Sequence, residues 1–152
     1  MSNNLDILQM NISTGMVVAS RHWRRICQMT LINYGITEAC AMPLLIIGRM
    51  GPGVRQVTVA QAAGMEGPSL VRLLDQMCAA GYVLRSEDAR DRRAKSLTLT
   101  ETGLVLVEAI EKELISLRRN ALEGISLADQ EAALRVIRAF EAADHLPVVT
   151  TP

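Results

Sequence analysis

The chain has 152 residues and no formal net charge at pH 7, and 49% of its residues are hydrophobic. This length and apolar content fit one compact domain, or a small domain joined to an oligomerisation element. The neutral total excludes a global field that would draw the whole protein to nucleic acid or anionic lipid, so such binding would need local clusters of charge.

The sequence has no targeting or cofactor signal that we can identify. Its first residues lack the cationic region and apolar run of a secretory signal. The longest uncharged stretches, residues 26–37 and 39–48, are shorter than the roughly 20 apolar residues that span a bilayer. We therefore expect a cytoplasmic protein with no membrane partner. Because Cys27, Cys40 and Cys78 lack metal-ligand spacing, we expect buried thiols, no disulfide framework, and neither a metal nor another cofactor.

Helical periodicity predicts two long elements in the first third of the chain. Residues 5–12 form an apolar arm of undefined structure, and a helix follows from residue 13 or 14 to about residue 34, where a glycine ends it. A second helix is expected from an N-cap at Thr37 to about Gly48. Pro43 falls inside this second pattern, which predicts either a kink or a displaced start.

A pair of shorter helices is predicted next. A Gly-Pro-Gly turn at residues 51–53 precedes a short extended piece at residues 54–57. Thr58 then caps a brief helix, residues 59–63, which Gly64 ends. The next helix begins shortly afterwards. Two short helices joined by a tight glycine-containing turn are typical of a helix-turn-helix.

The second helix of this pair, predicted over residues 67–81, has one apolar and one polar face. Pro68 suits its first turn and Gly81 its C-terminal end. At about 100° per residue, the apolar arc consists of Leu70, Leu73, Leu74, Met77 and Cys78. The opposite arc consists of Ser69, Arg72, Asp75, Gln76 and Ala79. Such a polar arc can recognise a partner.

Two strands, residues 82–85 and 96–100, follow this helix and are joined by a charged loop. From residue 85 to residue 95 there are five cations and three anions. The cations are Arg85, Arg90, Arg92, Arg93 and Lys95, and the anions are Glu87, Asp88 and Asp91. One interpretation is a solvated loop with internal ion pairs. Beside a recognition helix, however, the hairpin is the basic wing of a winged helix-turn-helix, whose arginines suit a narrow minor groove while Asp88 and Asp91 buttress them.

Two further helices complete the predicted fold. Thr100 caps the first, over residues 101–121. Ser126, with Asp129 three residues later, begins the second, which carries the apolar residues Ala133, Leu134, Ile137 and Phe140. These apolar faces need cover, and a two-fold dimer that uses the first helix and the arm of a second subunit would provide it. A purely intramolecular bundle is the alternative, and residues 147–152 are expected to fray.

Two of these stretches resemble the MarR family of transcriptional regulators. Residues 88–100, followed by Gly103, resemble its wing signature. Residues 68–76 look like the recognition helix of its SlyA-like branch, which Trp23-Arg24 also matches. The resemblance implies an obligate homodimer, a palindromic operator in double-stranded DNA, and often a small aromatic carboxylate or phenolic ligand that weakens DNA binding.

This resemblance also implies a division of the chain. The fold would be mainly α with a small β-hairpin wing. Residues 36–100 would form the winged helix-turn-helix DNA-binding domain, and residues 1–35 and 101–152 the helical dimerisation region. The two recognition helices of such a dimer would lie about 34–36 Å apart, which is one helical turn of DNA.

Carried over residue by residue, the resemblance implies a DNA-binding set and an effector-binding set. Pro68, Ser69, Arg72 and Gln76 would face the major groove. Arg90 would enter the minor groove, with Arg92, Arg93 and Lys95 on nearby phosphates. The effector would lie among Arg21, Ala41, Leu45 and Arg72, where an arginine beside aliphatic walls can hold a carboxylate. A solvated or ion-paired helix face is the alternative for Arg21, and Ala41 stands where SlyA-like proteins tend to place a tryptophan.

Three other functions fit the sequence less well, and one of them, a protein-interaction module that uses the winged fold without DNA, would leave the wing arginines unexplained. A thiol-based sensor of the same fold would use Cys27 in the first helix, with Arg24 supplying positive charge. An enzyme is not expected, because His22 and His145 are far apart in sequence and belong to no metal or triad motif, and no glycine-rich phosphate loop is present. We predict a ligand-responsive DNA-binding repressor.

Overall fold

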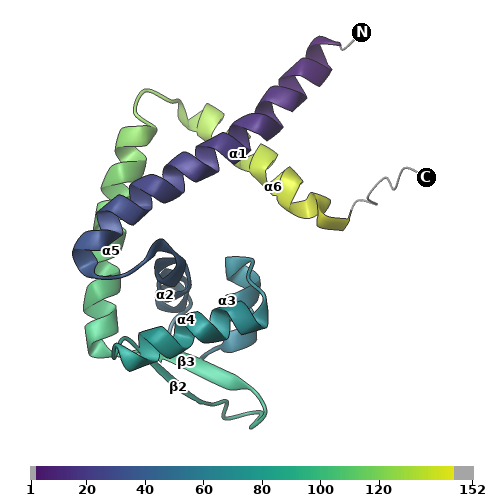
Figure 1. Cartoon of the computed structure of the whole chain (residues 1–152). Coiled ribbons are helices and arrows are strands. Elements are labelled where there is room, and N and C mark those ends of the chain that lie inside the picture. The colour runs from purple at the N-terminus through teal and green to yellow at the C-terminus, as the bar shows by residue number, and fades with distance from the viewer. Residues whose placement is uncertain (1–2, 146–152) are drawn as a thin grey trace. The chain divides into compact units, whose positions relative to one another are not determined.

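The computed structural model describes residues 3–145 (Figure 1), so the predicted fraying end, residues 147–152, lies outside the described range. The chain divides into two compact units after Ile115. The first unit contains α1 (Asn4–Leu31), a 3-10 turn (Ile32–Tyr34), α2 (Glu38–Met50), β1 (Val54–Arg55), α3 (Gln56–Ala63), α4 (Gly67–Ala79), β2 (Val83–Glu87), β3 (Lys95–Leu99) and most of α5 (Glu101–Ala121). The second contains the end of α5, then α6 (Leu127–Ala142) and a short 3-10 turn (Ala143–His145).

The first helix, α1, begins earlier than predicted. Asn3 caps it, and the Asp6 carboxylate accepts a 3.0 Å hydrogen bond from the Asn3 backbone N–H, which completes a capping box. The prediction that residues 5–12 form a separate arm is therefore wrong. No break occurs at Ser13, because its hydroxyl donates to the Met10 carbonyl within the helix (2.9 Å) and does not cap a new one.

The second helix, α2, lies at the centre of the first unit's core. The Thr37 hydroxyl accepts from the Cys40 amide at 3.3 Å, which confirms the predicted cap. Pro43 does not displace the start of the helix and is buried within it. The largest fully buried side chains around it are Leu31, Leu44, Ile47, Val59, Leu70, Leu74, Val83, Leu97 and Ile110. Burial of this aliphatic set holds α2, α3, α4 and the sheet together.

The strands form a three-stranded antiparallel sheet in the order β1-β3-β2. The register of the hairpin pairs Val83 with Leu99 and Arg85 with Leu97. The two-residue strand β1 pairs with β3, a contact that the sequence did not predict. Thr58 is not a cap, because α3 already begins at Gln56 as a continuation of β1. Figure 1 shows the hairpin of β2 and β3 extending beyond α3 and α4.

The last two helices begin at the predicted caps. The Thr100 hydroxyl accepts from the Gly103 amide at 3.0 Å at the start of α5. In the second unit, the Ser126 hydroxyl accepts from the Asp129 amide (3.1 Å) and donates to the Asp129 carboxylate (2.7 Å). These contacts confirm both N-terminal signals.

No single described helix is long and apolar enough to cross a membrane. Together, Asn4–Tyr34 and Glu38–Met50 meet that test by length and composition, with an 81° bend between them. The second of these segments is mostly buried within the first unit.

Candidate nucleic-acid interface

The helix α4 has the two faces that its sequence predicts. Leu70, Leu74 and Met77 are buried in the core. Pro68, Ser69, Arg72, Asp75 and Gln76 are exposed. The apolar face therefore fixes α4 to the core and leaves the polar arc exposed.

A tight turn sets the position of α4 relative to α3. Gly64 ends α3 with a φ of 62°, a conformation that suits glycine. The Met65 amide donates to the Ala60 carbonyl at 2.9 Å, closing the end of α3. Val59 and Ala60 of α3 are buried. The pair of helices thus forms a helix-turn-helix with α4 as its second, outward-facing helix.

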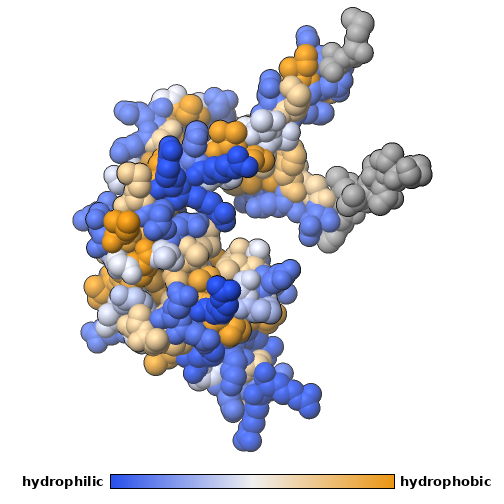
Figure 2. Space-filling model, viewed as in Figure 1, coloured by the Kyte–Doolittle hydropathy of each residue, from blue (hydrophilic) through white to orange (hydrophobic). Residues whose placement is uncertain are grey.

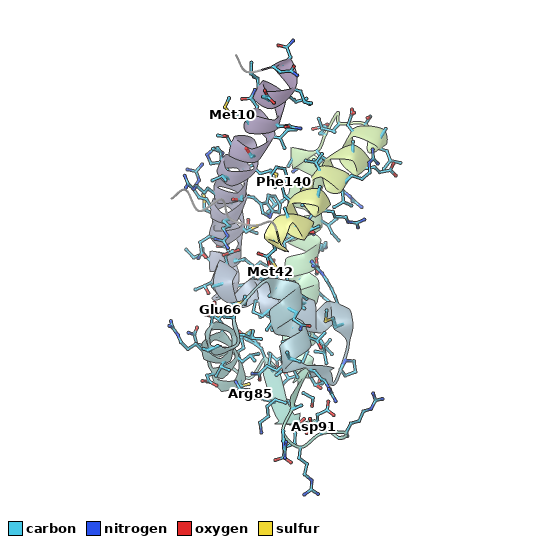
Figure 3. All side chains as sticks on the ribbon, turned by 90° about the vertical axis from the view of Figure 1, so that its right-hand side faces the viewer. Met10, Met42, Glu66, Arg85, Asp91 and Phe140 are labelled. Carbon is cyan, nitrogen blue, oxygen red and sulfur yellow. The ribbon has the colours of Figure 1, made fainter. Side chains whose placement is uncertain are left out.

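The hairpin carries exposed positive charge at its free end. Arg90, Arg92, Arg93 and Lys95 are all exposed, and among residues 3–145 none of the four side chains forms an ion pair. Figure 2 shows that the end of the hairpin is hydrophilic, and Figure 3 places Asp91 there. These cations are available to phosphate.

The shape of the wing loop depends on Asp88. One carboxylate oxygen accepts from the backbone amides of Arg90 (2.7 Å) and Asp91 (3.3 Å). The other accepts from Arg55 Nε at 3.0 Å. The backbone amide of Arg90, followed by the Arg55 side chain, lowers the pKa of Asp88 below its ordinary value of 3.8. Asp88 is therefore the ionised centre around which the loop folds.

Two more of the counted charges have partners, one outside the loop and one within it. Arg85 donates to Asp75 of α4 at 2.8 Å, so it is not among the unpaired cations of the wing. Asp91 accepts from the backbone amide of Arg93 at 3.0 Å and shapes the turn. Asp88 and Asp91 support the loop arginines through the backbone amides of Arg90 and Arg93, whereas the side chain that pairs with Asp88 is Arg55 of β1.

Arg55 is the residue of this region that sequence reasoning missed. It precedes α3 directly, and its partner Asp88 lies 33 residues later. A hollow of about 590 Å³ adjoins the wing loop, and its lining includes Arg55, Asp88 and Arg90 together with Glu87. The lining thus contains two cations and two anions, so it carries no net charge.

The predicted effector residues occupy different environments. Ala41 and Leu45 of α2 are buried, whereas Arg21 of α1 and Arg72 of α4 are exposed. Neither the hollow beside the wing nor a smaller apolar one of about 190 Å³ near Gly48 is lined by any of these residues. The effector site stays a prediction.

The remaining candidate groups include the buried cysteines of α1 and α2. Cys27 is buried in α1, and the thiol-sensor hypothesis stays untested. Cys40 is also buried, and its sulfur donates to the side-chain oxygen of Gln76 at 3.5 Å. In the part of the chain that the structure describes, no group of three or more His, Cys, Asp or Glu residues could hold a metal ion.

Comparison with known proteins identifies the family. A model described as the MarR family matches residues 34–94. The solved structure of transcriptional regulator PA3341 is 35% identical, covers 86% of this chain and 95% of that chain, and has a TM-score of 0.77. The S. aureus MepR–DNA complex shares the fold: it is 22% identical, covers 86% of this chain and 96% of that chain, and has a TM-score of 0.78. The transcriptional regulator SlyA also shares the fold, with 22% identity, coverage of 91% of this chain and 94% of that chain, and a TM-score of 0.74. The chain belongs to the MarR family and has the winged helix-turn-helix fold of its DNA-binding transcriptional regulators.

Proposed function

We propose that this protein is a dimeric transcriptional repressor that binds a palindromic operator through α4 and the wing of each subunit. One observation carries the proposal: four exposed cations without ion-pair partners among the described residues lie on the wing of a chain whose formal charge is zero. Local positive charge of this kind binds the phosphate backbone. MepR has the same fold and has been solved as a complex with DNA, which supports DNA binding as the use of this fold here.

The exposed arc of α4 has the chemistry to select bases. An arginine can form a bidentate contact with guanine, and a glutamine can do so with adenine, so Arg72 and Gln76 are the proposed base readers. Pro68 and Ser69 lie at the helix start, where they would approach the same groove. Arg90 is proposed for the minor groove, with Arg92, Arg93 and Lys95 on phosphates.

The exposed apolar side chains of α1 support the proposed homodimer. They include Leu5, Ile7, Leu8, Met10, Val17, Val18, Ile26 and Met29. Exposed apolar patches of this extent usually mark an interaction site. A two-fold partner would cover them and bring two readers to successive major grooves.

The Arg90→Ala variant tests the proposed DNA contact. We expect it to weaken binding to the operator by more than about 1 kcal/mol, because it removes one charge-assisted contact, and to leave the fold intact. The measurement is a gel-shift titration with DNA from upstream of the protein's own gene. Lys112→Ala on α5, which also removes one exposed cation, is the matched control. Wild-type affinity of Arg90→Ala would remove Arg90 from the interface.

We also propose that a small aromatic carboxylate or phenolic effector releases the DNA, with Arg21, Ala41, Leu45 and Arg72 at its site. Benzoate and phenol are suitable probes in a thermal-shift screen, because a ligand that binds the folded state raises the melting temperature. If Arg21 holds the carboxylate, Arg21→Ala should abolish effector-induced release and leave operator affinity unchanged. Unchanged release would exclude Arg21 from the site.

A further inference from the structure

An ion pair connects the helix α4 to the first strand of the wing. Arg85 Nη2 of β2 lies 2.8 Å from Asp75 Oδ1 of α4. The segment between the two elements is short, and its Tyr82 amide donates to the Met77 carbonyl of α4 at 3.0 Å. Figure 3 shows Arg85 at the end of the hairpin nearer the helices, away from Asp91 at the free end. The pair therefore closes the junction between the helix and the wing.

The Arg85 side chain is mostly buried and its guanidinium is only partly paired. Its side chain is 24% exposed, against 63% for Asp75. Among the described residues its Nε atom is buried and has no hydrogen-bond partner, so the guanidinium contacts Asp75 through one terminal nitrogen only. A buried donor without a partner costs free energy that an aliphatic side chain of similar length would avoid. The position is better explained by the contact with α4.

Asp75 lies on the exposed arc of α4, between Arg72 and Gln76 in sequence. A carboxylate on that arc would repel DNA phosphates and attract cations from the wing. Pairing with Arg85 neutralises this charge and fixes it in place. The pair therefore removes an unfavourable charge from the proposed DNA-facing surface and ties that surface to the hairpin.

We infer that Asp75 and Arg85 are positioning residues that set the sequence specificity of DNA binding by holding α4 in one orientation relative to the wing. The inference rests on the proposed function, because it requires α4 and the wing to contact the same DNA. Base contacts by α4 demand a fixed register, whereas phosphate contacts tolerate displacement. Loss of the pair thus lowers discrimination between sequences more than it lowers binding to DNA in general.

The test measures a specificity ratio for the full-length protein. The wild type first selects a preferred duplex from a random-sequence pool. Fluorescence anisotropy then gives Kd for that duplex and for a scrambled duplex of equal length and composition. The specificity ratio is Kd for the scrambled duplex divided by Kd for the preferred duplex. We expect Asp75→Asn and Arg85→Met each to lower this ratio about tenfold, which is the discrimination that one base contact provides. In the double variant the ratio should fall no further, because the two residues act as a unit.

The two single variants should differ on scrambled DNA. Asp75→Asn removes a negative charge, so its affinity for the scrambled duplex should equal or exceed that of the wild type. Arg85→Met leaves the Asp75 charge without a partner and should bind the scrambled duplex more weakly. Asp75→Glu, which keeps the charge, should recover part of the lost ratio. A general loss of folding would produce none of these opposite shifts.

Arg49→Met is the matched control, because it breaks an ion pair of similar length (Arg49 Nη2 to Glu111 Oε1, 2.6 Å) between α2 and α5. It should leave the ratio unchanged. If Arg85→Met does not fold, Asp75→Asn and Asp75→Glu still test the inference, because Asp75 is exposed and its substitution should not disturb the core. A wild-type ratio in Asp75→Asn, or losses that multiply in the double variant, would overturn the inference alone. A wild type that selects no sequence would overturn the proposed function with it.

Discussion

Asp88 shows how one side chain can organise the wing loop that we propose to bind DNA. Its carboxylate accepts from two backbone amides of the loop and from Arg55. The resulting loop leaves the side chains of Arg90, Arg92 and Arg93 exposed, and only the backbone amides of Arg90 and Arg93 help to hold the loop together. The charges that build the wing and the charges that we propose to bind phosphate are thus carried by different side chains.

The lowered pKa of Asp88 predicts how stability depends on pH. A carboxyl group whose pKa is lower in the folded state adds stability that is complete above its ordinary value of 3.8 and is lost as pH falls through the lowered pKa. Asp88→Asn should therefore be less stable than the wild type at neutral pH and should lose less stability below about pH 4. Thermal melts across this range provide the measurement.

Arg55→Met is the intermediate variant for the same experiment. It removes the side-chain partner of Asp88 and leaves both backbone amides in place. As pH falls below about 4, the drop in its melting temperature should be smaller than that of the wild type and larger than that of Asp88→Asn. If the melting temperatures of all three proteins fell equally as pH was lowered below about 4, Asp88 would not stabilise the wing.

The sequence predicted the composition of the wing but not its internal pairing. Asp88 pairs with a residue 33 positions earlier, and Arg85 with one 10 positions earlier. No local periodicity specifies partners at such separations, because they depend on how the strands and helices pack. Arg85 was therefore counted with the wing cations, and Arg55 was overlooked.

At the scale of elements, Gly103 fixes the junction between α5 and the sheet. A Cβ added at Gly103 would overlap the backbone carbonyl of Tyr82, which itself accepts from the Thr100 amide at 3.0 Å. Gly103 is buried at the start of α5. This close approach requires a residue without a side chain.

Gly103→Ala should therefore destabilise the protein by about 1–3 kcal/mol, since the backbone must shift to accept the methyl group. Chemical denaturation gives the free energy of unfolding. Gly15→Ala in α1 is the control, because an added Cβ there meets nothing within 4 Å. It should instead stabilise the helix by about 0.5–1 kcal/mol. Equal stability of Gly103→Ala and the wild type would refute the close contact.

Capped helices were predicted best, and irregular starts worst. Thr37, Thr100 and Ser126 are local signals that act within three residues, and the structure confirms all three. The start of α1 was missed because its capping residues precede the periodic pattern. The strand β1 was missed as a member of the sheet because two residues show no alternation, and its pairing with β3 depends on packing far along the chain.

At the scale of the whole molecule, the proposed dimer explains why a chain with a sufficient core leaves apolar side chains exposed on α1. Leu8 is 55% exposed. Leu8→Glu should weaken the dimer by about 2 kcal/mol, the burial of one leucine, or more. Analytical ultracentrifugation measures this change. Gln9→Glu adds the same charge at an exposed polar position of α1 and is the control.

A monomeric wild type would contradict the dimer and favour the intramolecular bundle. The proposed operator would then lose its symmetry, because one reader meets one half-site. The family membership and the fold would be unaffected. Dimerisation and DNA recognition are thus separate claims about the molecule.

The central claim, that this protein regulates transcription by binding a symmetric operator, is tested most directly by footprinting the wild type on the DNA upstream of its own gene. We expect protection of two half-sites about one helical turn apart, with affinity that falls steeply as salt rises, since several phosphates are contacted. Protection without a defined boundary, or binding that is insensitive to salt, would contradict the claim.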